Sequence, residues 1–219
     1  MRSRILDIET TGIEQAREWL DPLTPPRNYT KKESIDAWLV EAEAQREQAF
    51  GLDPDCCRIV CFGYQDIGSE PVVDVCANEF EEREILKRFW KTFAGQETRL
   101  ITFNGHRFDL PVILMRSIYL GVTYPYLQFS PMWRSHPHVD LFERLSLGGA
   151  RKDVKSLRFY ARRFGIPIFD SVSGRDIHAL VRQNTKEAWE AIANHTLFDL
   201  DLTRAVAEKL GVLSKTAIV

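Results

Sequence analysis

Two acidic residues stand two positions apart in an otherwise apolar segment near the start of the chain, in the string LDIETTG. The alternation is typical of a β-strand in which Leu6 and Ile8 face one side and the acids Asp7 and Glu9 face the other. Two carboxylates on one face of a strand are costly unless a cation neutralises them. The pattern indicates a divalent-cation site near a strand end at Gly12, and an edge strand with a solvated polar face is the alternative.

Two more acids follow at positions that a sheet and a helix could bring together. Asp109 closes the string NGHRFD, after an apolar strand expected over 99–103 and at the start of a helix expected over 109–119. Asp199 lies four residues after His195 on a predicted helix, so the two side chains point about 40° apart on one face. Read alone, Asp109 fits a helix N-cap and His195 fits a partly exposed histidine, so both alternatives stay open.

The composition favours a single globular domain without a strong overall charge. The 219 residues carry 29 Lys and Arg against 31 Asp and Glu, a formal net charge of -2, and 44% are hydrophobic. Any polyanionic partner would therefore have to be held locally. The apolar runs are far shorter than the ~20 residues that cross a bilayer, so we expect a cytoplasmic protein without membrane contact. The four cysteines lack metal-ligand spacing and are expected to be reduced and buried.

The pattern of elements predicts one α/β domain over residues 1–219, with a mixed β-sheet flanked by helices. The expected strands cover 4–9, 58–64, 71–76 and 99–103. The expected helices cover 79–94, 109–119, 140–147, 155–164, 176–182 and 186–210, with a loop over 123–138. Residues 13–56 are expected to form an insertion between the first and second strands, with an exposed helix over the charged stretch 31–50.

In this order, LDIETTG, NGHRFD and HTLFD resemble the three motifs of the DEDD, or DnaQ-like, superfamily of 3′-5′ exonucleases, which have a ribonuclease-H-like fold. Further stretches resemble a bacterial group related to the exonuclease domain of B-family DNA polymerases, namely 31–58, 156–167 and 174–177. One branch of the superfamily has tyrosine before the last acid and the other has histidine. His195 combines the residue of the histidine branch with the spacing of the tyrosine branch, and we interpret it as a substitution at the tyrosine position.

The resemblance implies metal-dependent hydrolysis of phosphodiester bonds. Two divalent ions about 3.5–4 Å apart can activate a water and stabilise the leaving oxygen, and hard oxygen ligands select Mg²⁺ or Mn²⁺. By resemblance, Asp7 bridges both ions. Glu9 and Asp199 hold the ion that activates water, and Asp109 reaches the second ion through water. His195 orients or deprotonates the attacking water.

The substrate implied by the resemblance is a single-stranded 3′ end, preferably of DNA, that releases nucleoside 5′-monophosphates. An RNA substrate, and a non-catalytic nucleic-acid-binding or polymerase-accessory module with the same fold, stay open as alternatives. The basic segment 151–163 is a candidate surface for tracking phosphates, although on composition a solvated helix face is the more common origin of such a segment. The candidate substrate-binding residues are Thr10, Thr11, Gly12, Phe103, Asn104, Phe108, Lys155 and Arg158.

Overall fold

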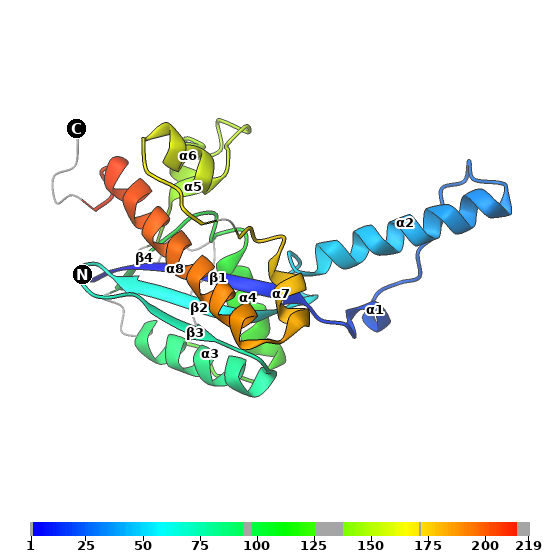
Figure 1. Ribbon diagram of the computed structural model, residues 1–219, viewed down its shortest axis with the longest axis horizontal. Helices are drawn as coiled ribbons and strands as arrows, with labels where there is room; N and C mark the ends of the chain where they lie inside the picture. The colour runs from blue at the N-terminus through cyan, green and yellow to red at the C-terminus, as the bar shows by residue number, and fades with distance from the viewer. Residues whose placement is uncertain (1, 94–97, 126–137, 171, 214–219) are drawn as a thin grey trace.

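Five strands form a mixed sheet at the centre of the protein, in a computed structural model that describes residues 2–93, 98–125, 138–170 and 172–213 (Figure 1). The strands are β1 (Arg2–Gly12), β2 (Cys57–Asp66), β3 (Val72–Val75), β4 (Thr98–Thr102) and β5 (His138–Asp140). Their spatial order is β3-β2-β1-β4-β5, with antiparallel pairing on the β2 side of β1 and parallel pairing on the β4 side. The prediction of an α/β fold with a mixed sheet flanked by helices is confirmed.

The first strand is central to the sheet, and both of its faces are covered. Leu6 and Ile8 belong to the core on one face, whereas Ile5 belongs to the core on the other. Asp7 and Glu9 share the face of Ile5, as the alternation predicts. β2 pairs with β1 at both acids, and α8 packs on the same strand. Glu9 is buried and Asp7 is half-buried, so the alternative of a solvated edge strand is wrong, and water solvates the two acids poorly.

The helices α3 (Glu79–Phe93) and α4 (Asp109–Tyr119) cover the face of the sheet that carries Leu6. A buried ion pair joins them, since the guanidinium of Arg116 donates to both carboxylate oxygens of Glu82 at 2.8 Å. Glu82 also accepts a hydrogen bond from the amide of Ile59 on β2 at 2.9 Å. The pair therefore fixes both helices to the sheet.

Four helices cover the opposite face, where α8 crosses the sheet (Figure 1). They are α5 (Leu141–Leu145), α6 (Leu157–Arg163), α7 (Ile177–Gln183) and α8 (Lys186–Lys209). α8 packs on β1 and β2 and touches α6 and α7. It begins after Thr185, whose hydroxyl accepts a hydrogen bond from the amide of Ala188, and this cap satisfies one of the free amides at the helix start. The longest helix thus lies over the strand that carries two of the acids.

Residues 13–56 leave the sheet between β1 and β2 and hold α1 (Ala16–Trp19) and α2 (Lys32–Phe50). α2 projects away from the sheet, and most of its residues are exposed or half-buried (Figure 1), as expected. Its end returns to the sheet, where Ala16, Phe50 and Cys56 form a small separate core. That the whole chain is one domain with this segment as an insertion stays a prediction.

The structure differs from the prediction at residues 138–140. The sequence predicts a loop up to 138 and a helix from 140, whereas the structure has β5 at His138–Asp140 and begins α5 at Leu141. A strand of three residues is too short to show an alternating pattern, so its pairing with β4 could not be predicted. The expected loop residues 126–137 lie outside the described part of the chain.

The four cysteines agree with the expectation that they are reduced and buried. All four cysteines are free and buried. Burial raises the pKa of Cys57 and of Cys61 to about 12, so these thiols keep their protons at neutral pH and are poor metal ligands. In the described ranges, no helix is long and apolar enough to cross a membrane.

Gly63 on β2 allows α8 to approach the sheet closely. It pairs with Asp7 across β1 and β2. A Cβ at this position would lie 2.5 Å from Cγ2 of Thr196 and 3.0 Å from Cδ1 of Leu200, both on α8. A side chain on Gly63 would therefore push α8 away from the strand that carries the acids.

We expect Gly63→Ala to lower the free energy of unfolding by about 1–3 kcal/mol, which is the usual cost of overpacking a core. Thermal or denaturant unfolding of the purified variant measures this loss. Thr196→Ser removes the methyl group that the new Cβ meets, so the double variant should recover at least half of the lost stability. A double variant no more stable than Gly63→Ala would show that this contact is not the cause.

Candidate active site

The fold brings the four predicted acids to one region from three elements. β4 pairs only with the first part of β1, so the chain that follows β4 lies beside the later part, which carries Asp7 and Glu9. Asp109 is the first residue of α4 and is only 4% exposed. Asp109 is not the N-cap residue of α4, because Phe108 occupies that position and no side chain caps the start of the helix there. Asp199 reaches the same region from α8, which packs on β1.

The four carboxyl groups interact electrostatically. Burial raises the pKa of Asp7 well above its ordinary value, and the charges of Glu9, Asp199 and Asp109 raise it further. Burial also raises the pKa of Glu9, with further contributions from the charges of Asp199 and Asp109. Burial raises the pKa of Asp109 to about 7 and raises the pKa of Asp199. Without a cation, the cluster is therefore stabilised by protons.

We expect the metal-free protein to lose stability as the pH rises from about 4 to about 7 and beyond. The folded pKa of Asp109, about 7, exceeds its value in an unfolded chain, about 3.9. The folded state therefore holds a proton that the unfolded state has released, and the associated stability is full at low pH and lost as the pH passes the folded pKa. In EDTA, the Tm should be lower at about pH 8 than at about pH 5.5 by at least ~4 °C. Asp109→Asn should reduce the difference in Tm between the two pH values. An unchanged difference would contradict the conclusion that the raised pKa of Asp109 causes it.

Two carboxylate oxygens of the cluster have no hydrogen-bond partner among the residues that the structure describes. They are Oδ2 of Asp7 and Oδ1 of Asp199, and both atoms are buried. Buried charged oxygens are rarely left without a partner, because desolvation is then uncompensated. Carboxylate oxygens in this number are the donors that hard divalent cations prefer. The residues present therefore fit a site for Mg²⁺ or Mn²⁺.

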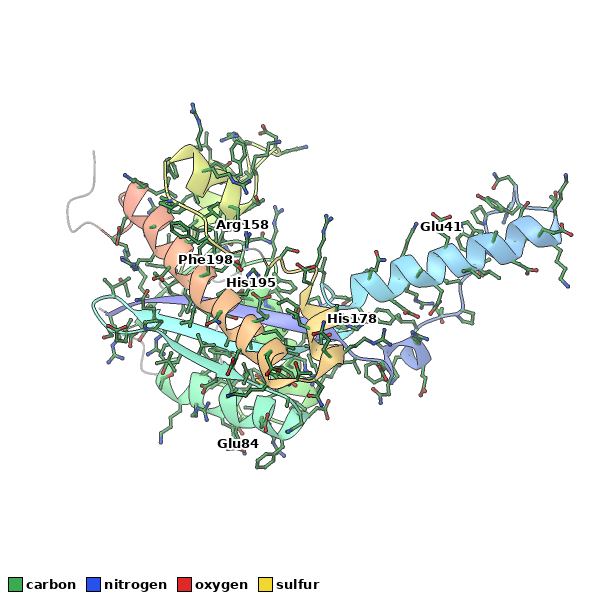
Figure 2. All side chains as sticks on the ribbon, in the orientation of Figure 1. Glu41, Glu84, Arg158, His178, His195 and Phe198 are labelled. Atoms are coloured by element: carbon green, nitrogen blue, oxygen red, sulfur yellow. The ribbon has the colours of Figure 1, made fainter. Side chains whose placement is uncertain are left out.

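His195 lies at the edge of the acid cluster, on α8 where this helix crosses the sheet (Figure 2). Its side chain is 3% exposed, so the interpretation as a partly exposed histidine is wrong, and its Nε2 lies 3.5 Å from Oε1 of Glu9. Ligand atoms of Glu9, His195 and Asp199 all lie within 4.8 Å of one another. The other ring nitrogen, Nδ1, lies 2.5 Å from Oδ2 of Asp170, a residue outside the three motifs.

The second motif forms a tight turn that is held by an acid from β5. Asn104 has a left-handed backbone with φ of 69°. Its amide and the amide of His106 donate to the carboxylate of Asp140 at 2.8 and 3.0 Å. Gly105 is required, because a Cβ there would lie 2.3 Å from Oγ1 of Thr102. Sequence reasoning placed Asp140 in a helix and missed this role, although an acid directly before α5 is an N-cap signal.

The residues that follow the acids on β1 are bound to α7 and to the end of α2. The hydroxyl of Thr10 donates to the carbonyl oxygen of Gly51 at 2.5 Å. The hydroxyl of Thr11 shares a hydrogen bond of 2.8 Å with Nδ1 of His178. A Cβ at Gly12 would lie 2.7 Å from a side-chain atom at the end of α2. These contacts hold the end of the strand, and the predicted role of Thr10, Thr11 and Gly12 in substrate binding stays a prediction.

The remaining predicted substrate-binding residues differ in how exposed their side chains are and in whether other groups of the protein already bind them. Phe103 is half-buried and packs against the core on the face of α8, with its ring centre 5.9 Å from that of Phe142 on α5. Phe108 packs against the core on the other face. Lys155 is exposed, whereas the guanidinium of Arg158 is engaged in hydrogen bonds within the protein. Lys155 is therefore the candidate with a free charged group.

Residues 55–203, more than half of the chain, match a family model described as "Predicted 3'-5' exonuclease related to the exonuclease domain of PolB". The chain belongs to this family. The match includes the second and third motifs with Asp109, His195 and Asp199, and it begins after the first motif with Asp7 and Glu9. The resemblance to the DEDD exonuclease superfamily is confirmed at the level of this PolB-related family.

Two DNA polymerases resemble this PolB-related chain. A DNA polymerase from Thermococcus aggregans is 30% identical over 130 residues, which are 54% of this chain and 7% of that protein. The structure of the family B DNA polymerase from the archaeon Pyrobaculum calidifontis superposes with a TM-score of 0.64 at 17% identity, covering 96% of this chain and 24% of that one. A structure of exonuclease I matches with a TM-score of 0.45 at 17% identity, over 97% of this chain and 45% of that one. The chain thus spans a small part of the polymerases, and the polymerase superposition supports the ribonuclease-H-like fold.

Proposed function

We propose that the protein is a metal-dependent 3′-5′ exonuclease that releases nucleoside 5′-monophosphates from single-stranded DNA ends. The observation that carries this proposal is the meeting of four acids with two unpartnered, buried carboxylate oxygens beside His195. A phosphodiester would be repelled by such a cluster, so binding of the substrate requires cations between them. The combination supports hydrolysis of a phosphate ester in preference to simple nucleic-acid binding.

The four acids would play different roles in holding two metal ions. Asp7, on the central strand and within reach of the charges of all three other acids, would be shared by two ions. Glu9 and Asp199 would hold the ion near His195, and Asp109 would reach the other through water. The chemistry that Mg²⁺ or Mn²⁺ supplies when bound is activation of water and neutralisation of charge on the phosphate and the leaving oxygen.

His195 would handle the proton of the attacking water. Its Nδ1 is occupied by Asp170, and Nε2 is the nitrogen that faces the acid cluster. Nε2 would orient the water and accept its proton as the water oxygen bonds to phosphorus. The bond between phosphorus and the 3′ oxygen of the preceding nucleotide breaks as the new bond forms. The leaving 3′ oxygen takes a proton from solvent water and becomes the new 3′ hydroxyl, the released product is a nucleoside 5′-monophosphate, and His195 returns its proton to solvent. Hard cations prefer oxygen ligands, which leaves the imidazole for this role.

The similarity to DNA polymerases favours DNA over RNA as the substrate. Direct contacts that would sense a 2′-hydroxyl decide this preference, and Lys155 offers an exposed charge for the phosphate backbone. A single strand fits the proposal because a terminal phosphodiester must reach carboxylates that are largely buried.

A 5′-labelled single-stranded oligonucleotide with Mg²⁺ or Mn²⁺ tests the proposal. We expect a ladder of single-nucleotide steps that is abolished by EDTA, and we expect a circular single strand to resist because it has no end. Asp201→Asn is the matched control for acid substitutions, since Asp201 lies on α8 with an exposed side chain paired to Arg204. The control should keep full activity. A ladder on RNA alone would support the ribonuclease alternative, and no ladder on either substrate would overturn the exonuclease.

A further inference from the structure

Asp170 connects the candidate site to α6, although it belongs to none of the three motifs. It lies between α6 and α7, and its Oδ2 accepts from Nδ1 of His195 at 2.5 Å and from the guanidinium of Arg158 at 2.6 Å. Its other oxygen, Oδ1, accepts from the amide of Val172 at 2.9 Å. Both oxygens of the carboxylate therefore accept hydrogen bonds, and three partners hold it in place.

Arg158 fixes the segment that carries Asp170. Besides the carboxylate, its guanidinium donates to the carbonyl oxygen of Asp170 at 3.1 Å and to that of Val172 at 2.6 Å. The guanidinium carbon lies 5.6 Å from the ring centre of Phe198 on α8. Figure 2 labels Arg158 and Phe198 together with His195, which lies further along α8 where this helix crosses the sheet. With these bonds made inside the protein, Arg158 is suited to bracing Asp170 more than to binding phosphate.

The bond to Asp170 determines which nitrogen of His195 faces the acids. A carboxylate only accepts hydrogen bonds, so Nδ1 must carry the proton in this contact. The distance of 2.5 Å to Asp170 is shorter than the 3.5 Å from Nε2 to Glu9, so the closer carboxylate holds the ring. Burial raises the pKa of Asp170, but hydrogen bonds from His195 and Val172 and the nearby positive charges outweigh burial and lower it. Asp170 therefore stays ionised and able to accept.

We propose that Asp170, braced by Arg158, is a positioning residue that holds His195 in the Nδ1-protonated form with Nε2 directed at the acid cluster. Its effect on turnover rests on the exonuclease function proposed above, whereas the orientation of the ring does not. Removing Asp170 leaves the ring free to turn, and it leaves Glu9 as a neighbouring acceptor for a proton on Nε2. The reactive nitrogen would then be occupied.

Imidazole ¹⁵N NMR on the metal-free protein tests the orientation without any assay of activity. We expect wild-type His195 to show a protonated Nδ1 at a pH where the ring is neutral. Asp170→Ala should shift the population toward protonated Nε2, and Asp170→Asn should have a smaller effect, because its amide oxygen still accepts. Asp201→Asn is the control with the same charge change on an exposed site of α8. An unchanged tautomer in folded Asp170→Ala would overturn the proposal.

Kinetics test the consequence of this orientation. Partners that orient a metal-ligating histidine typically contribute about 10- to 100-fold. We expect the same scale for a histidine that activates water, so kcat for Asp170→Ala should fall by that factor with KM within about twofold. Asp170→Asn should recover part of the rate. A change in KM with kcat unaltered would overturn the positioning role. Equal losses of kcat in Asp170→Ala and Asp170→Asn that follow from reduced folding would overturn it as well. An inactive wild type with the expected NMR result would instead count against the exonuclease function and leave the orientation supported.

Discussion

Replacing Asp7 with asparagine should abolish nucleotide release and, in EDTA, make the protein more stable. The asparagine amide removes a charge that the proposed ions require, and the loss of several kcal/mol of transition-state stabilisation corresponds to at least about 10³-fold in kcat. The metal-free protein should gain stability, because the buried charge of Asp7 is opposed by three neighbouring acids. The labelled-oligonucleotide assay and thermal unfolding in EDTA measure the two effects on the same preparation.

The opposite signs of these effects separate a functional role from a structural one. A variant that loses activity because it folds poorly would have a lower Tm than the wild type. Asp201→Asn changes the charge equally at an exposed position and should alter neither quantity. An Asp7→Asn protein that keeps even a tenth of the wild-type rate would show that Asp7 does not hold the ions.

Replacing His195 should lower the rate more than the affinity for substrate. We expect His195→Ala to reduce kcat by about 10²- to 10⁴-fold, the usual contribution of a general acid or base, with KM changed little. His195→Tyr should retain part of the activity with a changed pH optimum, because a tyrosine hydroxyl can orient the water but is a different proton acceptor from an imidazole. Steady-state kinetics over a range of pH values measure both predictions.

The binding of Mn²⁺ distinguishes two roles for His195. If Nε2 only orients or deprotonates water, His195→Ala should bind Mn²⁺ with an affinity close to that of the wild type in calorimetry. If Nε2 ligates an ion with Glu9 and Asp199, whose ligand atoms lie within 4.8 Å of it, the affinity should fall strongly. An alanine variant with the wild-type rate would exclude both roles.

The sequence was sufficient to predict the central strand and the acids. The alternation in β1 is a local signal that places Asp7 and Glu9 on one face. Asp109 and Asp199 were selected by the resemblance of three motifs, in their order along the chain, to the DEDD superfamily. The acids therefore emerge from the sequence before any coordinates are known.

The residues that position His195 and the second motif could not be predicted in the same way. Asp170 meets His195 across 25 positions of the chain, from a segment with no periodic pattern, and no local rule identifies that contact. β5, with three residues, offers too little pattern to be recognised as a strand, so the support that Asp140 gives to Asn104 was also missed. Gly63 is different, since a glycine inside a strand pattern signals close approach and could have been singled out.

Anomalous diffraction from crystals grown with Mn²⁺ and a nucleoside 5′-monophosphate tests most directly whether the acids hold metal at a phosphate. We predict two anomalous peaks at the cluster, with the carboxylate of Asp7 contacting both and the phosphate of the nucleotide beside them. Peaks at other acids, or none at Asp7, Glu9, Asp109 and Asp199 in crystals that contain the nucleotide, would contradict the proposed exonuclease site.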